Sequence, residues 1–365
     1  MSTDKEKSAL IAMSGGVDSS VAAYLMIKNG YYCEGTTMRL YRNNDIGISS
    51  YHTCCSQKDI DDAADVAFSL DIPYEVLDFT FDFKDRIIDE FVRVYESGGT
   101  PNPCIDCNRY MKFDKLLKYA SEKGLRYIVT GHYARKEYDE RSGRFILKKA
   151  LDARKDQSYV LYMLSQEQLS RIQFPLGNMK KEQTREIADK LGFCNSKKHD
   201  SQDICFVPDG DYAGFMERYT GKHYTEGCFI DKNGKTVGRH RGCIRYTIGQ
   251  RKGLGIAMGE PVYVINKDMD ANTVTVGRES ELFSKVLYAN DVNWLSVPEP
   301  KGTIRAKAKI RYRQDEKDAT VFNCGNGIIK VEFDEPQRAI SVGQAVVLYD
   351  GDTVLGGGTI TDVPR

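Results

Sequence analysis

The stretch A-M-S-G-G-V-D-S-S at residues 12–20 decides the fold of this chain. It follows the apolar residues 9–12 and leads into residues 21–26, where apolar side chains recur with helical spacing. The pattern predicts a strand, a glycine turn and the N-terminus of a helix. Such a turn presents several backbone N–H groups to one point, and the helix dipole adds positive potential there. We therefore expect it to bind a phosphate group, although it is not a G-x-x-x-x-G-K-[ST] loop.

Length and composition bound the class of protein. At 365 residues the chain exceeds one typical core, so two or three domains are expected. No apolar run approaches the ~20 residues of a membrane span, and residues 1–7 are charged and polar, unlike a signal peptide. We expect a cytoplasmic protein with no membrane partner. Lys plus Arg and Asp plus Glu both total 52, which excludes a globally basic protein but not a local basic face for nucleic acid.

The order of the expected elements indicates an α/β protein. Strand-like and helix-like segments alternate in the first half, which favours a parallel sheet. These segments are strands at 32–38, 74–79 and 127–130, and helices at 58–70, 84–95, 112–123 and 181–191. After a short helix at 212–219 the chain is rich in β-forming residues and glycine turns. We predict a parallel-sheet nucleotide-binding domain at 1–207, a small central β-rich domain at 208–280 and an all-β, barrel-like domain at 281–365.

Ten cysteines in such a chain indicate reduced thiols rather than a disulfide framework. Residues 99–109 hold Cys104 and Cys107 as C-x-x-C, in what two prolines predict to be an ordered loop just before a helix, where the nucleophilic thiolate is favoured. A second segment, residues 200–206, holds Cys205. A zinc site is an alternative, with Cys54 and Cys55 as further ligands. The other cysteines are expected to be small buried hydrophobic residues: Cys33, Cys194, Cys228, Cys243 and Cys324.

Several motifs resemble known families. S-G-G-x-D-S-S at residues 14–20 resembles the PP-loop of the N-type ATP pyrophosphatases. T-P-N-P-x-x-x-C-N-R-x-x-K-F at 100–113 and D-S-x-x-I-C-F at 200–206 resemble the two cysteine motifs of the tRNA-specific 2-thiouridylases, the MnmA family. Further segments match that family in order along the chain: T-G-H-Y (130–133), K-D-Q-S-Y (155–159), T-I-G-Q-R-K-G-L-G (247–255), R-Y-R-Q (311–314) and L-G-G-G (355–358).

The resemblance implies that the C2 oxygen of the wobble uridine in a tRNA anticodon loop is replaced by sulfur. ATP, with Mg²⁺, would adenylate that oxygen, so that AMP leaves when sulfur attacks. Cys205 would carry a persulfide from a cysteine desulfurase or a sulfur-relay protein. Cys107 would be the nucleophile that helps deliver the sulfur and then closes a disulfide with Cys205, or releases sulfide. Asp18 is also a reasonable Mg²⁺ ligand.

By the same resemblance, two sets of residues contact the two substrates. ATP is expected at Ala12, Met13, Ser14, Gly15, Gly16, Val17, Asp18, Ser19, Met38 and Gly131. The tRNA and its target base are expected at Asn102, Pro103, Cys104, His132, Lys155, Asp156, Gln157, Arg311, Tyr312 and Gln344. Core packing is the alternative for Met38, and a satisfied polar residue beside ATP is the alternative for His132.

Cys104 departs from the family pattern, because many members carry Asp at that position. Asp106 is one candidate to take over the role of that Asp. Thiolates at Cys104, Cys107 and Cys205 would also suit a [4Fe–4S] cluster with one open iron, in which Cys205 is a ligand and not a persulfide carrier. Two other classes stay open: a PP-loop ligase acting on a small molecule, such as argininosuccinate synthetase or GMP synthetase, and an RNA-binding or sulfur-carrier protein with a vestigial nucleotide site.

Overall fold

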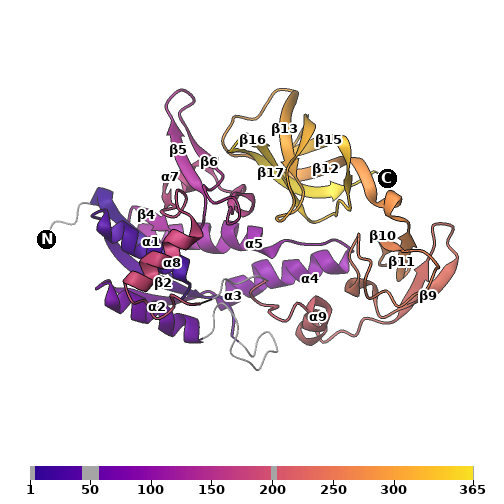
Figure 1. The fold of residues 1–365 in the computed structure, drawn as a ribbon, viewed down its shortest axis with the longest axis horizontal. Coiled ribbons are helices and arrows are strands. Elements are labelled where there is room, and N and C mark those ends of the chain that lie inside the picture. Colours follow the sequence, from indigo (N-terminus) through magenta and orange to yellow (C-terminus); the bar gives the residue numbers. More distant parts are fainter. Residues whose placement is uncertain (1–4, 43–56, 199–203, 365) are drawn as a thin grey trace.

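The computed structural model of the chain describes residues 5–42, 57–198 and 204–364. It contains a parallel sheet in the N-terminal part, a small sheet in the middle of the chain and a large antiparallel sheet at the C-terminus. Figure 1 shows the N-terminal part at one end of the molecule, with the middle and C-terminal strands at the other. Within the described residues, no helix is both long and apolar enough to span a bilayer. The predicted α/β class is confirmed.

The N-terminal sheet is parallel, with strand order β3-β2-β1-β4-β7. Its strands are β1 (Ser8–Ala12), β2 (Tyr32–Arg39), β3 (Tyr74–Asp78), β4 (Tyr127–Val129) and β7 (Ile172–Gln173). Ala9, Leu10 and Ile11 of β1 are fully buried, as expected for a central parallel strand covered on both faces. The chain continues to β2 on one side of β1 and later to β4 on the other, so the topological switch point lies at the carboxyl end of β1.

Helices cover both faces of this sheet. On one face Val21 and Ala22 of α1 pack with Ile11, and on the other Leu116 and Ala120 of α6 pack with Leu10. The α-helices are α1 (Val17–Lys28), α2 (Gln57–Ser69), α3 (Thr80–Phe83), α4 (Asp89–Glu96), α5 (Pro103–Asp106), α6 (Leu116–Glu122), α7 (Gln166–Ser170) and α8 (Lys181–Lys190). Short 3-10 helices are η1 (Lys5–Lys7) and η5 (Ser158–Leu161), and π-helical turns are η3 (Lys84–Ile88) and η4 (Cys107–Lys115).

The prediction of a loop over residues 99–109 is wrong for its second half. Helix begins at Pro103 and continues through α5, η4 and α6 to Glu122, so Cys104 and Cys107 lie inside its first turns. Proline is tolerated at the first helical position, because its missing N–H has no intrahelical partner there and its φ already suits a helix. The second proline therefore starts the helix, and only Gly99 to Asn102 remain outside it.

The middle and C-terminal parts are built mainly of strands. The middle part contains α9 (Tyr212–Thr220), β8 (Gly227–Ile230), β9 (Thr236–His240), η6 (Cys243–Arg245), β10 (Tyr263–Asp268), β11 (Thr273–Gly277) and η7 (Glu279–Leu282). The C-terminal strands are β12 (Phe283–Trp294), β13 (Thr303–Lys309), β14 (Lys317–Gly325), β15 (Ile328–Arg338), β16 (Ala345–Asp350) and β17 (Thr353–Asp362). Pairing of β12 with β17 closes the ring β12-β15-β14-β13-β16-β17 into a barrel.

A hairpin from the N-terminal part joins this barrel. Strands β5 (Arg135–Asp139) and β6 (Arg144–Lys148) extend the C-terminal sheet, because Lys148 pairs with Thr353 of β17. In Figure 1 the hairpin rises from the N-terminal part on the side of the barrel. The sequence patterns did not predict this connection, which fixes the barrel relative to the parallel sheet.

Candidate functional site

The turn between β1 and α1, residues 13–16, is tied to the rest of the sheet by its backbone. The Met13 N–H donates to the Thr36 carbonyl of β2 at 2.8 Å. The Ser19 hydroxyl lies inside the turn, where it accepts from the Ser14 N–H at 3.2 Å and donates to the Gly16 carbonyl at 3.0 Å. Gly16 is the N-cap of α1 and has no side chain to occupy the first helical N–H groups. This turn therefore has the geometry of an anion-binding loop.

Two glycines are required by close packing around this turn. Gly15 has φ +69°, and a Cβ there would collide with the backbone carbonyl of Asp59. A Cβ on Gly131, after β4, would lie 2.7 Å from the Ser19 nitrogen and 2.8 Å from the Asp18 carbonyl carbon. Gly131 therefore contacts the start of α1 directly, as expected for residues that surround one ligand at the switch point.

Asp18 is held in the turn by a buried cation that sequence reasoning missed. Lys181 Nζ donates to both carboxylate oxygens of Asp18, at 2.7 and 2.8 Å, and its side chain is only 7% exposed. Tyr133 Oη donates to the same carboxylate at 2.9 Å. Lys181 is the first residue of α8 and lies 163 positions from Asp18, so no local signal in the sequence indicates the pair.

A second missed group supports the turn from its other side. The Gly15 carbonyl accepts from Asn195 Nδ2 at 3.1 Å and from Lys198 Nζ at 3.0 Å. Lys198 Nζ also pairs with Asp59 at 2.5 Å and with Asp62 at 2.6 Å, both on α2. The turn is therefore clamped between α2 and the segment that precedes Cys205.

The K-D-Q residues 155–157 are connected to the nucleotide turn. The Tyr133 N–H donates to Gln157 Oε1 at 2.9 Å, and the Gln157 N–H donates to the Tyr133 carbonyl at 2.9 Å. The Asp156 carboxylate accepts from the Ala150 N–H and the Ser158 hydroxyl, at 2.9 and 2.8 Å. Because Tyr133 also binds Asp18, one tyrosine connects the nucleotide turn to residues expected at the tRNA.

The barrel brings its expected tRNA residues to the same region. Tyr312 Oη donates to the Asp156 carbonyl at 3.2 Å. Burial raises the pKa of Tyr312, and the charges of Asp156 and Cys104 raise it further, which places Cys104 within electrostatic reach of that hydroxyl. Gln344 Nε2 donates to the Thr100 carbonyl at 2.8 Å, beside Asn102. Gln344 therefore contacts, and Tyr312 lies near, the segment Thr100–Cys104, which we call the target-base loop.

Cys107, Cys205 and Met38 share one apolar environment. All three are partly buried and pack against the cluster that contains Tyr41, Phe83, Phe91, Met111 and Phe206. Tyr41 Oη donates to the Cys205 carbonyl at 2.7 Å, which fixes the backbone of that cysteine beside the end of β2. The two cysteines of the expected sulfur transfer therefore lie against one cluster, whereas Cys104 is exposed.

The structure bears on two expectations about individual residues. His132 is buried between Phe113 and Phe174, and its Nδ1 lies 2.8 Å from Thr130 Oγ1. Burial lowers the pKa of His132 well below its ordinary value, so the ring is neutral, and this placement favours the satisfied polar residue over a direct tRNA contact. The expectation that the remaining cysteines are buried is wrong for Cys194 and Cys324, which are exposed.

No three His, Cys, Asp or Glu side chains of the described residues form a group that could hold a metal ion. The described set includes Cys104, Cys107 and Cys205, so the three-thiolate arrangement expected for an iron–sulfur cluster is not assembled. Cys54 and Cys55, the further zinc ligands considered above, lie outside the described residues. Asp106 was considered above as the residue that takes over the role of the Asp that many family members carry at position 104. Burial and the nearby Glu90 raise its pKa to about 6, against the opposing charge of Arg109.

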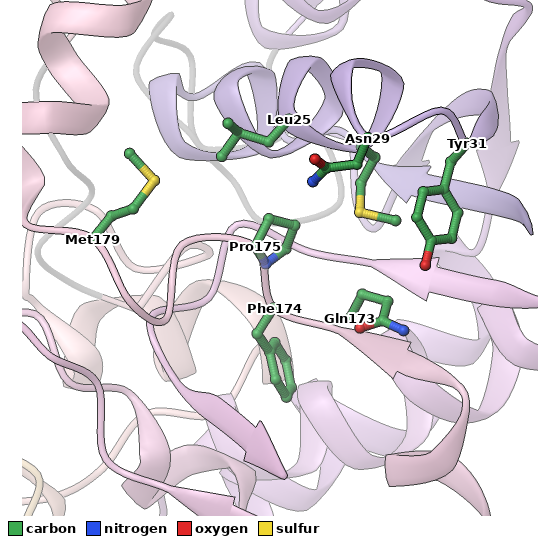
Figure 2. Close-up of a pocket in the computed structure, with 8 residues that line it drawn as sticks. Leu25, Asn29, Tyr31, Gln173, Phe174, Pro175 and Met179 are labelled. Carbon is green, nitrogen blue, oxygen red and sulfur yellow. The ribbon is translucent and has the colours of Figure 1, made fainter.

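A cavity of about 290 Å³ lies at the far end of α1 from the nucleotide turn. Figure 2 shows its lining side chains, which come from the C-terminal end of α1 and the turn after it, and from β7 and the segment that follows it. They are Leu25, Met26, Asn29, Tyr31, Gln173, Phe174, Pro175 and Met179. None of them belongs to the residues expected to contact ATP or tRNA.

The parallel sheet, the glycine turn at its switch point and the ion pair of Asp18 with the buried Lys181 define the N-terminal part as a nucleotide-binding domain. Family models match three consecutive segments of the chain. They are described as a tRNA methyl transferase HUP domain (residues 7–209), a tRNA methyl transferase PRC-barrel domain (213–278) and an aminomethyltransferase beta-barrel domain (284–360).

Curated relatives match along nearly the whole chain. The tRNA-specific 2-thiouridylase MnmA of Clostridioides difficile is 47% identical over 97% of this chain and 98% of its own length. That of Acetivibrio thermocellus is 48% identical over 97% of this chain and 99% of its own length. A solved 4-thiouridine synthetase–RNA complex with bound ATP is 17% identical, covers 59% of this chain and 50% of its own, and has a TM-score of 0.36, too low to assign function. The chain belongs to the MnmA family of tRNA-specific 2-thiouridylases, and the expected family is confirmed.

Proposed function

We propose that this protein catalyses the ATP-dependent 2-thiolation of the wobble uridine of tRNA, as the names of its relatives suggest. The observation that carries the proposal is the connection through Tyr133, which binds Asp18 of the nucleotide turn and Gln157. Gln157 caps η5, and η5 contacts α5, the helix in which the target-base loop ends. An enzyme that adenylates a base needs its nucleotide loop and its base-binding loop fixed relative to one another, because reacting atoms must approach in the correct orientation.

The first step is attack of the uridine C2 oxygen on the α-phosphate of ATP, with loss of pyrophosphate. Backbone N–H groups at residues 15–17 and the Lys181 ammonium bind phosphate oxygens in this proposal. Gly131 lets the segment after β4 lie directly against the start of α1, where the nucleotide turn ends. Mg²⁺ fits the site as a counter-ion held mainly by phosphate oxygens and water. Three of the roughly four lone-pair directions of the Asp18 carboxylate are already used by Lys181 and Tyr133, so it can supply one ligand.

The second step transfers sulfur. The terminal sulfur of a Cys205 persulfide attacks C2, the C2–O bond breaks and AMP leaves with that oxygen. The Cys107 thiolate then attacks the Cys205 sulfur, the S–S bond breaks and 2-thiouridine is released with the electron pair of that bond. This leaves a Cys107–Cys205 disulfide, which a cellular thiol must reduce before the next turnover. The packing of both cysteines against one cluster supports this pairing.

The partners follow from these steps. The tRNA offers its anticodon stem-loop, whose unpaired bases can be splayed out and read by their edges. A cysteine desulfurase or a sulfur-relay protein supplies the persulfide to Cys205. Asn102, Pro103 and Cys104 surround the target base, and the Asp106 carboxyl, with a pKa of about 6, suits proton transfer near neutral pH. Among the described residues no three-thiolate group supports the iron–sulfur alternative.

The test is 2-thiouridine formation in unmodified tRNA, measured by nucleoside mass spectrometry under anaerobic conditions. Wild type, Cys107→Ser and Cys205→Ser are compared with Cys324→Ser, an exposed cysteine of the barrel, as the matched control. The proposal expects product only with ATP and a persulfide donor, loss in the first two variants and normal product in the control. Product from inorganic sulfide that depends on bound iron would favour the cluster, and no product under either regime would favour a small-molecule ligase.

A further inference from the structure

The barrel holds the target-base loop through a segment that we call the brace, Ala339–Gln344. The Thr100 N–H donates to the Val342 carbonyl at 2.8 Å. Gln344 Nε2 donates to the Thr100 carbonyl at 2.8 Å and to the Pro101 carbonyl at 3.3 Å. The N–H and the carbonyl of Thr100, two residues before Asn102, are thus both hydrogen-bonded to the barrel.

The brace and the loop approach each other closely at two glycines. Gly343 has φ +86°, and a Cβ there would lie 2.9 Å from Val94 Cγ1 and 3.1 Å from the Thr100 nitrogen. A Cβ on Gly99 would lie 2.8 Å from Val94 Cγ1 and 3.3 Å from the Val342 carbonyl oxygen. The two backbones therefore meet directly beside the Val94 side chain, and Gln344 Nε2 faces protein carbonyls.

Arg311 donates hydrogen bonds to two residues of the brace. Its Nη2 donates to the Ala339 carbonyl at 2.7 Å and to the Ser341 hydroxyl at 3.0 Å. Ala339 has φ +54°, a left-handed conformation that a non-glycine residue keeps only when its surroundings hold it. Ala339 also touches the central part of the chain, since a Cβ on Gly249 would lie 2.8 Å from the Ala339 Cβ. All three parts of the chain therefore meet at the brace.

We propose that Gln344, supported by Arg311, is a positioning residue that fixes Thr100 and Pro101 so that the target-base loop receives the uridine in a reactive orientation. This inference rests on the proposed function, and it revises the expectation that these two residues act by contacting tRNA. Because reacting groups displaced by about 1 Å can cost a factor of ~100 in rate, loss of the Gln344 hydrogen bonds should slow chemistry and leave substrate binding intact.

The experiment separates rate from affinity. Gln344→Met removes the donor at similar length, and Gln337→Met is the control, because Gln337 Nε2 donates only locally, to the Glu335 carbonyl. We expect the single-turnover thiolation rate at saturating tRNA to fall roughly 10- to 100-fold in Gln344→Met. The Kd values for tRNA and ATP should stay within about threefold of wild type, and the control should match wild type. Arg311→Met should slow the same step, and the double variant should be less impaired than the product of the two single effects.

Several outcomes would overturn the proposal. A tenfold weaker tRNA Kd with an unchanged saturating rate would make Gln344 a direct tRNA contact, and an unchanged rate and Kd would remove any role. If Gln344→Met melts well below wild type, the same readings are taken on Gln344→Leu, which removes the donor without adding a charge. A wild type that makes no 2-thiouridine refutes the proposed function instead, so the two failures are distinguishable.

Discussion

Replacement of Lys181 by Met tests whether the Asp18 pair governs the nucleotide turn. Lys181 is almost fully buried and Asp18 is 29% exposed, so the substitution leaves a carboxylate with only its Tyr133 hydrogen bond in a partly desolvated site. At about 2.8 Å and an effective dielectric constant of about 20, the gross attraction that is lost is about 6 kcal/mol. Desolvation of the ammonium offsets part of it, and removal of one partner from a buried pair typically costs about 3–5 kcal/mol. Because Asp18 keeps some solvent, we expect about 2–3 kcal/mol.

The assay is urea unfolding followed by far-UV circular dichroism. The helical signal comes mainly from α1–α8 of the N-terminal part, whereas the single tryptophan, Trp294, is on β12 of the barrel. The matched control is Lys190→Met, an exposed lysine on the same helix α8. Asp18→Asn combined with Lys181→Met should recover at least half of the lost stability, because it removes the orphaned charge. ATP should bind Lys181→Met at least tenfold more weakly, since that charge then faces the phosphates.

Two results would refute this reasoning. If Lys181→Met unfolds at the same urea concentration as Lys190→Met, the pair does not stabilise the turn. If Asp18→Asn combined with Lys181→Met has a lower free energy of unfolding than Lys181→Met alone, the loss does not come from an uncompensated Asp18 charge.

Three further predictions concern other contacts of the site. Gly131→Ala should weaken ATP binding at least tenfold in calorimetry without changing tRNA affinity, because the new Cβ meets the Ser19 nitrogen at 2.7 Å; unchanged ATP binding would show that this approach does not matter. Lys198→Met should weaken ATP binding by roughly tenfold, because it removes one of the two donors to the Gly15 carbonyl and leaves the Asp59 and Asp62 carboxylates without their lysine, and equal affinity would contradict the clamp. Asp106 has a folded pKa of about 6, above its ordinary 3.8, so its stabilising contribution is present below about pH 4 and is lost as pH rises through 6. Asp106→Asn should therefore gain about 2 kcal/mol over wild type between pH 4 and pH 7 in urea unfolding, and a pH-independent difference would disprove the shift.

Much of the N-terminal fold could be predicted because its signals are local. The apolar segment before Ser14 and the helical spacing after Val17 define β1 and α1 within about twenty residues. Gly192, with φ +66°, follows α8 and ends the helical segment that was predicted at 181–191. The helix start at Pro103 was missed because proline is ambiguous: it breaks a helix internally but begins one well.

The remaining features depend on contacts between distant segments. Lys181 and Lys198 resemble surface lysines in the sequence, and only the fold places them at the nucleotide turn. The β5–β6 hairpin joins the barrel through one residue pair 205 positions apart, as counted from Lys148 to Thr353. Family motifs identified Gln344 and Arg311, but only the structure shows that their hydrogen bonds go to protein groups of the target-base loop and the brace.

The most direct test of the proposed adenylation follows the uridine oxygen. A tRNA carrying oxygen-18 at C2 of the wobble uridine is incubated with enzyme, ATP and a persulfide donor, and the products are analysed by mass spectrometry. Attack of the C2 oxygen on the α-phosphate predicts that the label appears in the phosphate of AMP, in step with 2-thiouridine formation. Label found in water or in pyrophosphate, with unlabelled AMP, would contradict the account.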